Sequence, residues 1–211
     1  MSGRPVVLLS PTPCAGAIHL PAIETEFVHE TAELAGCDAV IFTSKQAVAA
    51  LEKSCHHWKS LKLFSVGEGT SRAIAEAGGT VFYEATNAYG DILAEEIVLK
   101  YPGFKYFYPR AETVVSDLEN ILKKAGVRLR SQTLYRTRCR AIDESRIPEN
   151  AAIVFTAPST VNCFFKQVRW RRDWIAVAIG DRTAQALGSH IACYVSPAPL
   201  LEASVTFAAS L

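Results

Sequence analysis

Short runs of apolar residues alternate along the chain with longer stretches that repeat their apolar positions at helical spacing. The short runs have the length of strands and no polar face, which is typical of parallel sheets that are covered on both sides. Helices between such strands predict an α/β fold. The predicted strands are Val6–Leu9, Ala39–Phe42, Leu63–Val66, Val81–Tyr83, Tyr106–Tyr108, Ile153–Phe155, Ile175–Ile179 and Ala192–Val195, and the predicted helices are residues 45–53, 70–77, 113–125, 159–168 and 182–189.

This pattern repeats once within the chain. The residues FTS at 42–44 are echoed by FTA at 155–157, an offset of 155 − 42 = 113 residues. The residues VGEGT at 66–70 are echoed by IGDRT at 179–183 at the same offset, 180 − 67 = 113. The repeat predicts two similar parallel-sheet domains of flavodoxin-like type.

One of the two domains is predicted to be discontinuous. The first copy has a leading strand at Tyr106–Tyr108, whereas the second copy has none nearby, and Val6–Leu9 at the other end of the chain can supply it. Two connections between domains usually frame a cleft, which is a preferred place for ligands. The predicted layout is one domain from residues 1–17 and 140–211, a second domain from 29–127, and two extended linker strands at 18–28 and 128–139.

Charge and length of apolar runs exclude several classes of function. The chain has 211 residues, with 22 Lys+Arg against 21 Asp+Glu and a formal net charge of +1. Nucleic acids and anionic membranes both call for a strongly basic face, so we predict neither as a partner. No apolar run approaches the roughly 20 residues that a bilayer requires. Residues 1–20 contain three prolines and no long apolar stretch, so we predict no signal peptide and a cytoplasmic protein.

The six cysteines include no C-x-x-C pair, and several lie within or beside apolar stretches. We interpret them as buried, reduced thiols, as is usual inside cells. A zinc site at Cys55-His56-His57 is disfavoured because adjacent residues of a helix do not share a face and a second pair of ligands is missing. We therefore predict no metal site.

Motifs of nucleotide binding and of hydrolysis are missing. The residues GEGT at 67–70 do not fit the P-loop pattern, and a dinucleotide fingerprint fails at Arg72. The chain has no G-x-S-x-G, no H-E-x-x-H and no paired carboxylates, and none of its five histidines lies in a predicted strand-end turn. If the protein is an enzyme, its substrate is reactive and needs mainly to be held in a productive shape.

Ligands of open parallel sheets lie at the carboxyl ends of the strands, so the residues that follow each strand are the candidates for binding. Several of them open a helix, whose free N–H groups suit anions. Structural roles are alternatives: Ser44 can cap a helix, Gly67 and Gly180 can permit tight turns, and Lys45 and Arg110 can be solvated charges. The candidates are Ser10, Thr43, Ser44, Lys45, Gly67, Thr70, Arg110, Ser159, Gly180 and Thr183.

A set of short motifs resembles one known family. In the order of the uroporphyrinogen-III synthases, the chain has IFTSKQAV (41–48), SVGEGTSRAIAEAGG (65–79), YPRAE (108–112), TLYRT (133–137), VFTAPSTV (154–161), AIGDRTAQAL (178–187) and SPAPLLEA (196–203). The resemblance covers nearly the whole chain. The chain departs from the family pattern at Gln46, where the family often has Asn, and at Asp181 and Arg182, in a turn that often has small or polar residues.

The resemblance implies an enzyme that converts hydroxymethylbilane, a linear tetrapyrrole, to uroporphyrinogen III. Hydroxide leaves the ring A hydroxymethyl group, the resulting azafulvene attacks ring D, and a spiro intermediate reopens and recloses with ring D inverted. No metal or organic cofactor is implied, and we expect a monomer. The tyrosine of TLYRT, Tyr135, is implied as the catalytic residue. Separately, Thr70 and Thr183 occupy equivalent places in the repeat, each just after a Gly turn, so we expect them to face one another across the cleft.

Two other functions fit the predicted fold. A non-enzymatic two-domain α/β protein could close on a small anion, but such proteins normally carry an export signal. A regulatory module that binds a partner protein would need an exposed apolar patch. An assay that separates the two uroporphyrinogen isomers distinguishes the enzyme from both.

Overall fold

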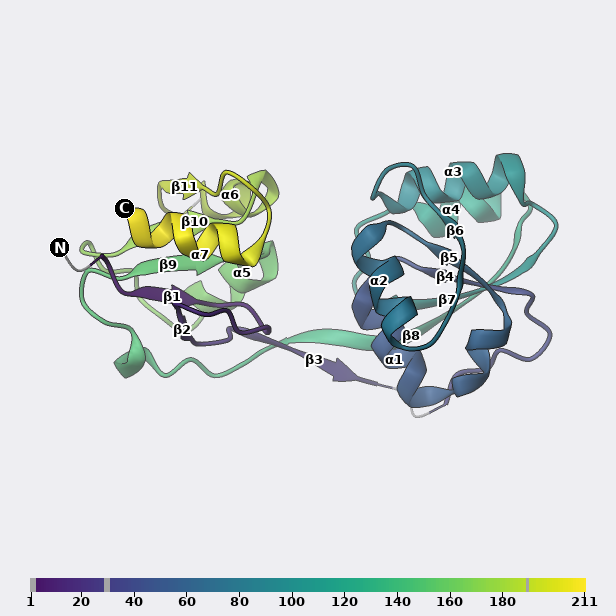
Figure 1. Cartoon of the computed structure of the whole chain (residues 1–211), viewed down its shortest axis with the longest axis horizontal. Helices are drawn as coiled ribbons and strands as arrows, with labels where there is room; N and C mark the ends of the chain where they lie inside the picture. The colour runs from purple at the N-terminus through teal and green to yellow at the C-terminus, as the bar shows by residue number, and fades with distance from the viewer. Residues whose placement is uncertain (1–2, 29–30, 189) are drawn as a thin grey trace. The chain divides into compact units, whose positions relative to one another are not determined.

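A computed structural model describes residues 3–28, 31–188 and 190–211, and the chain divides into two compact units (Figure 1). Unit 1 comprises Met1–Glu24 and Thr137–Leu211, and unit 2 comprises Thr25–Arg136. The divisions fall within two strands, β3 (Ile23–Phe27) and β8 (Arg128–Cys139). Of the predicted ranges, residues 1, 2, 29, 30 and 189 lie outside the described part of the chain.

Unit 1 contains a parallel sheet of five strands in the order β11-β10-β9-β1-β2. Strand β1 comes from the N-terminus and lies between β2 and β9, so the unit is built from two separate stretches of sequence. Its elements are β1 (Val6–Leu8), β2 (Ile18–His19), η2 (Glu144–Arg146), β9 (Ala152–Phe155), α5 (Pro158–Phe165), β10 (Ile175–Ala178), α6 (Asp181–Gly188), β11 (Cys193–Val195) and α7 (Leu201–Ser210).

Both faces of this sheet are buried by helices. Alternate residues of each strand point to opposite faces, so each face has its own core. Val7 and Ile153 pack with Phe164 of α5 and Leu187 of α6. Leu8 and Val154, one position further along these strands, pack instead with Val205 and Ala208 of α7. The continuous apolar strands are therefore explained by a sheet between two helical layers.

Unit 2 contains a six-stranded sheet in the order β3-β8-β7-β4-β5-β6. The pairs from β8 to β6 are parallel, and β3 runs opposite to β8, as shown by the bonds from Val28 N to Leu134 O and from Arg140 N to Ala22 O, both 2.9 Å. The remaining elements are β4 (Ala39–Phe42), α1 (Lys45–Ser54), η1 (His56–Ser60), β5 (Lys62–Ser65), α2 (Glu68–Glu76), β6 (Val81–Glu84), α3 (Gly90–Lys100), β7 (Lys105–Ala111) and α4 (Leu118–Lys124).

The core of unit 2 also has two layers. Val40 and Phe42 face Leu51 of α1, whereas Ala39 and Ile41 face the side covered by α3 and α4. The α/β fold with parallel sheets is thus confirmed. The predicted linker strands belong to the sheets for much of their length, since β2 pairs with β1, and residues 128–135 of β8 pair with β7.

The internal repeat has a direct structural counterpart. Strands β4 and β9 start 152 − 39 = 113 residues apart, and helices α2 and α6 start 181 − 68 = 113 residues apart. Strand β1 pairs with β9 as β7 pairs with β4. The two sheets therefore share one plan, and residues 113 positions apart can be compared one with another.

The predicted helices differ from the structure at α4, α3 and α7. The helix expected at 113–125 begins only at Leu118, because β7 continues to Ala111 and the β-branched run Thr113-Val114-Val115 suits extended chain better than helix. Helices α3 and α7 are missing from the predicted set, because their apolar residues are spread around the helix rather than gathered in one stripe.

The prediction that all six cysteines are reduced thiols is wrong for one pair. Cys139, at the end of β8, forms a disulfide with Cys163 of α5, and the two Cα atoms are 5.2 Å apart. Their separation of 24 residues matches no motif, and only the fold brings them within bonding range. Cys14, Cys37, Cys55 and Cys193 are free.

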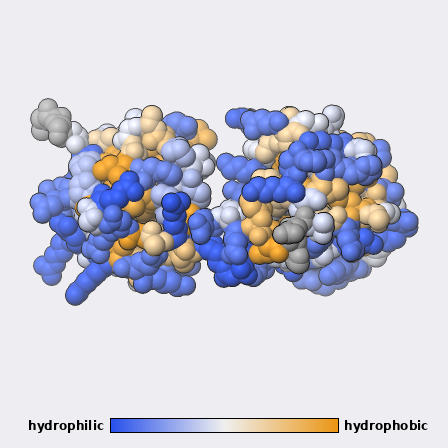
Figure 2. Space-filling view, turned by 90° about the horizontal axis from the view of Figure 1, so that it is seen from below, coloured by the Kyte–Doolittle hydropathy of each residue, from blue (hydrophilic) through white to orange (hydrophobic). Residues whose placement is uncertain are grey.

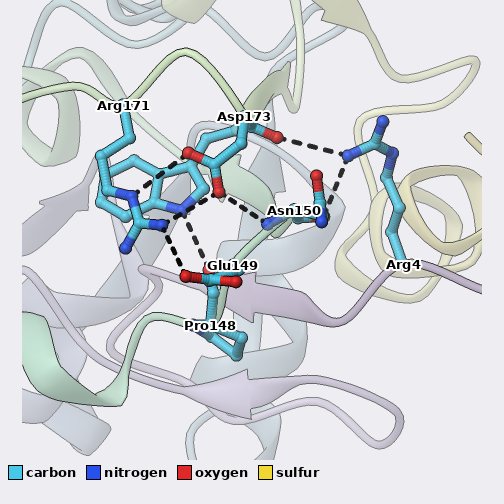
Figure 3. Close-up of polar contacts among 7 residues, drawn as sticks. Arg4, Pro148, Glu149, Asn150, Arg171 and Asp173 are labelled. Carbon is cyan, nitrogen blue, oxygen red and sulfur yellow. Dashed lines mark hydrogen bonds and ion pairs between the residues drawn. The ribbon is translucent and has the colours of Figure 1, made fainter.

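A polar cluster ties together the amino ends of the unit 1 strands (Figure 3). The Asp173 carboxylate accepts bonds from Asn150 N at 2.8 Å and from the Arg171 guanidinium at 3.2 Å. Arg4, just before β1, donates to the carbonyl oxygen of Asn150 at 3.0 Å. Because this cluster lies at the edge opposite to the carboxyl ends, we assign it to stability rather than to binding.

On the face seen in Figure 2, apolar residues lie among hydrophilic ones on both units. Exposed large apolar side chains are scattered over several elements, with Leu99 at 80% and Val115 at 88% exposure the most open among the described residues. No helix in the described ranges is both long and apolar enough to cross a membrane.

Candidate functional site

Four hydroxyl groups meet at the carboxyl end of the unit 2 sheet. Thr43 and Ser44 follow β4 directly, Tyr108 lies on β7, and Tyr135 lies on β8. Thr43 Oγ1 lies 3.1 Å from the Tyr108 hydroxyl, and Ser44 Oγ lies 2.6 Å from the Tyr135 hydroxyl. Three predicted site residues, Thr43, Ser44 and Tyr135, thereby take part in two separate hydroxyl pairs at this edge.

The alternation of side chains along extended backbone explains why two adjacent residues reach different tyrosines. Tyr108 packs in the core beneath α3 and α4, whereas Tyr135 packs in the core beneath α1 and α2. Thr43 and Ser44 point to opposite sides of the sheet, so each meets the phenol on its own side.

An irregularity in strand pairing sets the direction of Tyr135. Arg110 of β7 pairs with Thr133 of β8, but the next residue, Ala111, pairs with Tyr135, so Leu134 is an extra residue. One inserted residue reverses which face the following side chains take, and such bulges often aim side chains at functional sites. The bulge therefore places Tyr135 on the same side as Ser44.

Burial keeps both phenols protonated. Tyr108 is 1% exposed and Tyr135 is 7% exposed. Burial raises the pKa of Tyr135, while the hydrogen bond with Ser44 opposes that rise. Burial likewise raises the pKa of Tyr108, against the bonds with Thr43 and Ser116. At neutral pH each group can therefore serve as a proton or hydrogen-bond donor.

Helix α1 begins at the pair formed by Ser44 and Tyr135. Ser44 is its N-cap, and the serine oxygen accepts a bond from Ala47 N at 3.1 Å. Lys45 is the first helical residue and is exposed. The free N–H groups of the first turn point toward the carboxyl edge, as expected for a helix that follows a parallel strand.

The second predicted turn of unit 2 is built around Gly67. Its carbonyl oxygen accepts bonds from Thr70 N at 2.9 Å and Ser71 N at 3.0 Å, and its N–H donates to Ser65 Oγ at 3.3 Å. A Cβ at position 67 would lie 3.1 Å from the Cβ of Ala88, which explains the glycine by close packing. Thr70 is 7% exposed in the first turn of α2.

Arg110 has partners within its own unit. Its guanidinium donates to Ala111 O at 3.2 Å and lies 3.5 Å from Glu119 Oε2 of α4. It lines a polar cavity of about 390 Å³ together with residues 112–114 and Ser116. In the described structure the Arg110 charge is thus paired with Glu119 rather than fully solvated.

The carboxyl edge of unit 1 carries fewer hydroxyl pairs. Ser10 follows β1, is 4% exposed, and accepts a bond from Thr12 N at 3.0 Å. At the position equivalent to Ser44 the residue is Ala157, so Thr160 Oγ1 instead accepts from the N–H groups of Thr156 and Ala157, each at 3.2 Å. Ser159 is the second residue of α5 and is half-buried.

The turn before α6 differs from its counterpart in unit 2. The Gly180 carbonyl oxygen accepts bonds from Thr183 N and Ala184 N, both at 3.0 Å. A Cβ added at Gly180 would meet no described atom within 4 Å. Packing within the unit therefore does not explain this glycine. Thr183, 3% exposed, is equivalent to Thr70, and the expected approach of these two side chains stays a prediction.

Two residues of the edges were missed by the sequence analysis. Tyr108 was assigned only to a strand, although a tyrosine at a strand's carboxyl end beside a Thr-Ser turn was a usable signal. Thr160 was not singled out, although its spacing three residues after the N-cap position is typical of capping. Within the described ranges, no group of three His, Cys, Asp or Glu side chains could hold a metal ion.

Comparisons with known proteins agree on one family. The family model described as uroporphyrinogen-III synthase HemD matches residues 14–205. A crystal structure of uroporphyrinogen-III synthetase from Helicobacter pylori is 24% identical, with a TM-score of 0.83 over 98% of this chain and 99% of that one. A mutant synthase structure from the extremely thermophilic bacterium Thermus thermophilus is 18% identical, with a TM-score of 0.51 over 89% and 85% of the two chains. The search of curated protein sequences gave no match.

Proposed function

The chain belongs to the uroporphyrinogen-III synthase family and is an enzyme of haem biosynthesis, and on that premise we propose that Tyr135 is the acid of its reaction. In this reaction hydroxymethylbilane closes to uroporphyrinogen III with inversion of ring D and loss of water. The observation that carries the proposal is a buried phenol at the carboxyl edge, whose hydroxyl lies 2.6 Å from Ser44 Oγ and whose pKa is raised by burial.

The acid step balances as follows. The C–O bond of the ring A hydroxymethyl group breaks, and its electron pair leaves with the oxygen, which takes the phenol proton and departs as water. The pyrrole supplies electrons to the remaining carbon, giving a cationic azafulvene beside the tyrosine phenolate. The proton released when the macrocycle is completed restores the phenol. Well-placed acid assistance accelerates such a step by roughly 10²–10⁴-fold.

Binding of the substrate carboxylates is proposed for the edges of both sheets. Acetate and propionate groups suit helix N-termini and backbone N–H donors, which need no large excess of Lys and Arg. That agrees with a formal net charge of +1 in a protein whose substrate is a polyanion. The residues proposed to contact substrate are Ser10, Thr43, Ser44, Lys45, Gly67, Thr70, Arg110, Ser159, Gly180 and Thr183.

Finer points of the proposal concern cellular place and assembly. We propose a cytoplasmic monomer that uses no metal or organic cofactor, because the chemistry is driven by the reactive substrate and needs shape more than additional reagents. A linear tetrapyrrole is the proposed partner. Gel filtration with light scattering would reveal an assembly and so contradict the proposed monomer.

The reaction is tested by its isomer pattern. Purified protein is given hydroxymethylbilane, the product is oxidised, and isomers I and III are separated by chromatography. We expect isomer III well above a blank without protein, because the linear substrate closes spontaneously only to isomer I. Isomer I alone, at the rate of the blank, would favour the non-enzymatic binding protein instead.

A further inference from the structure

The shortest polar contact of the candidate site joins Ser44 to Tyr135. Ser44 Oγ lies 2.6 Å from the phenolic oxygen and also accepts a bond from Ala47 N at 3.1 Å. A serine hydroxyl has one proton and two acceptor positions. Because the Ala47 N–H occupies one acceptor position, the serine proton stays available for the phenolic oxygen.

Capping alone does not require a hydroxyl at this place in the fold. The equivalent residue of unit 1, 157 − 44 = 113 positions later, is Ala157, and α5 starts there without a capping hydroxyl at the N-cap residue. Where the serine is present, its hydroxyl lies 2.6 Å from the Tyr135 hydroxyl.

We propose that Ser44 is a positioning residue for Tyr135: it donates its hydroxyl proton to the phenolic oxygen and directs the phenol proton toward the substrate. When that proton leaves with the departing hydroxyl group as water, the phenolate accepts the hydrogen bond from Ser44, and the serine keeps its own proton. The inference rests on the proposed acid role of Tyr135. It gives Ser44 a role beyond substrate contact and helix capping.

The electrostatics of the site agree with this role. Burial raises the pKa of Tyr135 and so makes the phenol a weaker acid, whereas the bond from Ser44 lowers it. Tyr108 is the other titratable group whose charge acts on Tyr135, and it raises the pKa. Ser44 is thus the group that eases release of the proton from a buried tyrosine.

Three substitutions separate positioning from capping. Ser44→Asp keeps an N-cap acceptor for Ala47 N, since Asp and Ser cap equally well, but an ionised carboxylate cannot donate to the phenolic oxygen. Ser44→Thr keeps both abilities and tests rescue. Ser44→Ala loses both. Each is made in the full chain and compared by kcat at saturating hydroxymethylbilane and by thermal unfolding.

A second measurement follows Tyr135 without substrate. The chain has seven tyrosines, so ¹³Cζ-labelled tyrosine NMR is assigned with Tyr135→Phe, and the Tyr135 signal is titrated with pH in each variant. We expect Ser44→Asp and Ser44→Ala to raise the pKa of Tyr135 and to lower kcat by about tenfold or more, as for loss of a bond to a charged group. Ser44→Thr is expected to stay within about threefold of the parent kcat.

The outcomes distinguish this inference from the proposed function. Parent-like kcat and an unchanged Tyr135 titration in Ser44→Asp would overturn the positioning role, even where Tyr135→Phe is slow. A parent-like kcat in Tyr135→Phe would instead overturn the acid role and the positioning role with it. A decrease of the unfolding midpoint in Ser44→Ala with full kcat would leave Ser44 a helix cap, which also contradicts the inference.

Discussion

The carboxyl edges of the two sheets share their backbone plan and differ in their side chains. The edge of unit 2 has two phenols, each bonded to a hydroxyl of the Thr43-Ser44 turn. The equivalent edge of unit 1 has Leu8 and Ala157 at two of these places, and Thr160 serves the backbone N–H groups instead. The two copies thus share the turns that start helices, and among the described residues the pairs of a phenol with a turn hydroxyl lie only at the unit 2 edge.

This difference suggests a division of labour between the copies. Both edges offer helix N-termini that suit carboxylates, so binding can use the shared backbone. Proton transfer needs a specific side chain in a specific environment, and in the described residues only unit 2 buries a phenol at this edge. Each of the following predictions tests one side of this comparison.

The largest expected effect is that of Tyr135→Phe. We expect it to lower the kcat for isomer III by about 10²-fold without abolishing turnover, because acid assistance is lost while binding and shape persist. The matched control is Tyr106→Phe, on the neighbouring strand, where the phenol donates to Tyr101 O at 2.8 Å, away from the carboxyl edge. Equal kcat in the two variants would remove the distinction between the edges.

The next largest expected effect is on the stability of unit 1. Cys139→Ser removes the cross-link to α5 at an exposed position, so it leaves no cavity in the core. A loop of this length predicts a loss of about 3 kcal/mol from the unfolding free energy of unit 1 and little change in unit 2. Hydrogen exchange resolved by peptide would show this in oxidised protein. Cys14→Ser, which alters a free cysteine of the same unit, is the control.

Reductant is expected to abolish the difference in hydrogen exchange between the parent protein and Cys139→Ser. The parent protein treated with reductant is expected to exchange like Cys139→Ser. Denatured, unreduced parent protein should show four reactive thiols, since four of the cysteines are free. A count of six would contradict the disulfide.

Smaller effects are expected at the equivalent glycines Gly67 and Gly180. Substitution by alanine should affect stability at Gly67 and substrate binding at Gly180. Gly67→Ala places a Cβ 3.1 Å from Ala88, and we expect a loss of about 1–3 kcal/mol of stability. Gly180→Ala meets no described atom within 4 Å, so stability should stay within about 1 kcal/mol of the parent. If the turn approaches substrate as proposed, Gly180→Ala raises KM several-fold. Unchanged KM would make the open space at Gly180 irrelevant to binding.

The fold was largely predictable because its signals are local. All eight predicted strands are present, and the offset between FTS at 42–44 and FTA at 155–157 carried the two-domain plan. Contacts between residues that are distant in the sequence were not predictable from the pattern of apolar and polar positions. The Cys139–Cys163 bond and the register shift at Leu134 depend on how strands pair across long stretches of chain.

The site shows the same limit. The strand-end rule found Thr43 and Ser44, and the family resemblance added Tyr135, but only the bulge places the phenol against Ser44. Arg110, which is proposed to contact substrate, shows what such a rule leaves out. A cation after a strand suggested a carboxylate partner in the substrate, and the structure provides one in Glu119. Position along a strand predicts where the Cα atom of a residue lies. It does not predict which groups a long side chain such as that of Arg110 contacts.

The smallest expected effect tests the amino edge of unit 1, where Asp173 joins strand starts rather than ligands. The bond from Asn150 N, with further bonds from Arg171, holds the pKa of Asp173 below its usual range. A carboxyl whose pKa is lowered by folding stabilises the fold above its unfolded pKa, near ~3.9, and that contribution is lost as the pH falls through the folded value. Asp173→Asn should therefore slightly lower the unfolding midpoint of unit 1 at pH 7, and the difference from the parent should shrink below about pH 4. The control is Glu149→Gln, whose exposed carboxylate lies 3.6 Å from Arg171 and should contribute almost nothing at either pH. A difference between Asp173→Asn and the parent that persists undiminished well below pH 4 would show that the carboxylate charge is not what ties these strand starts together.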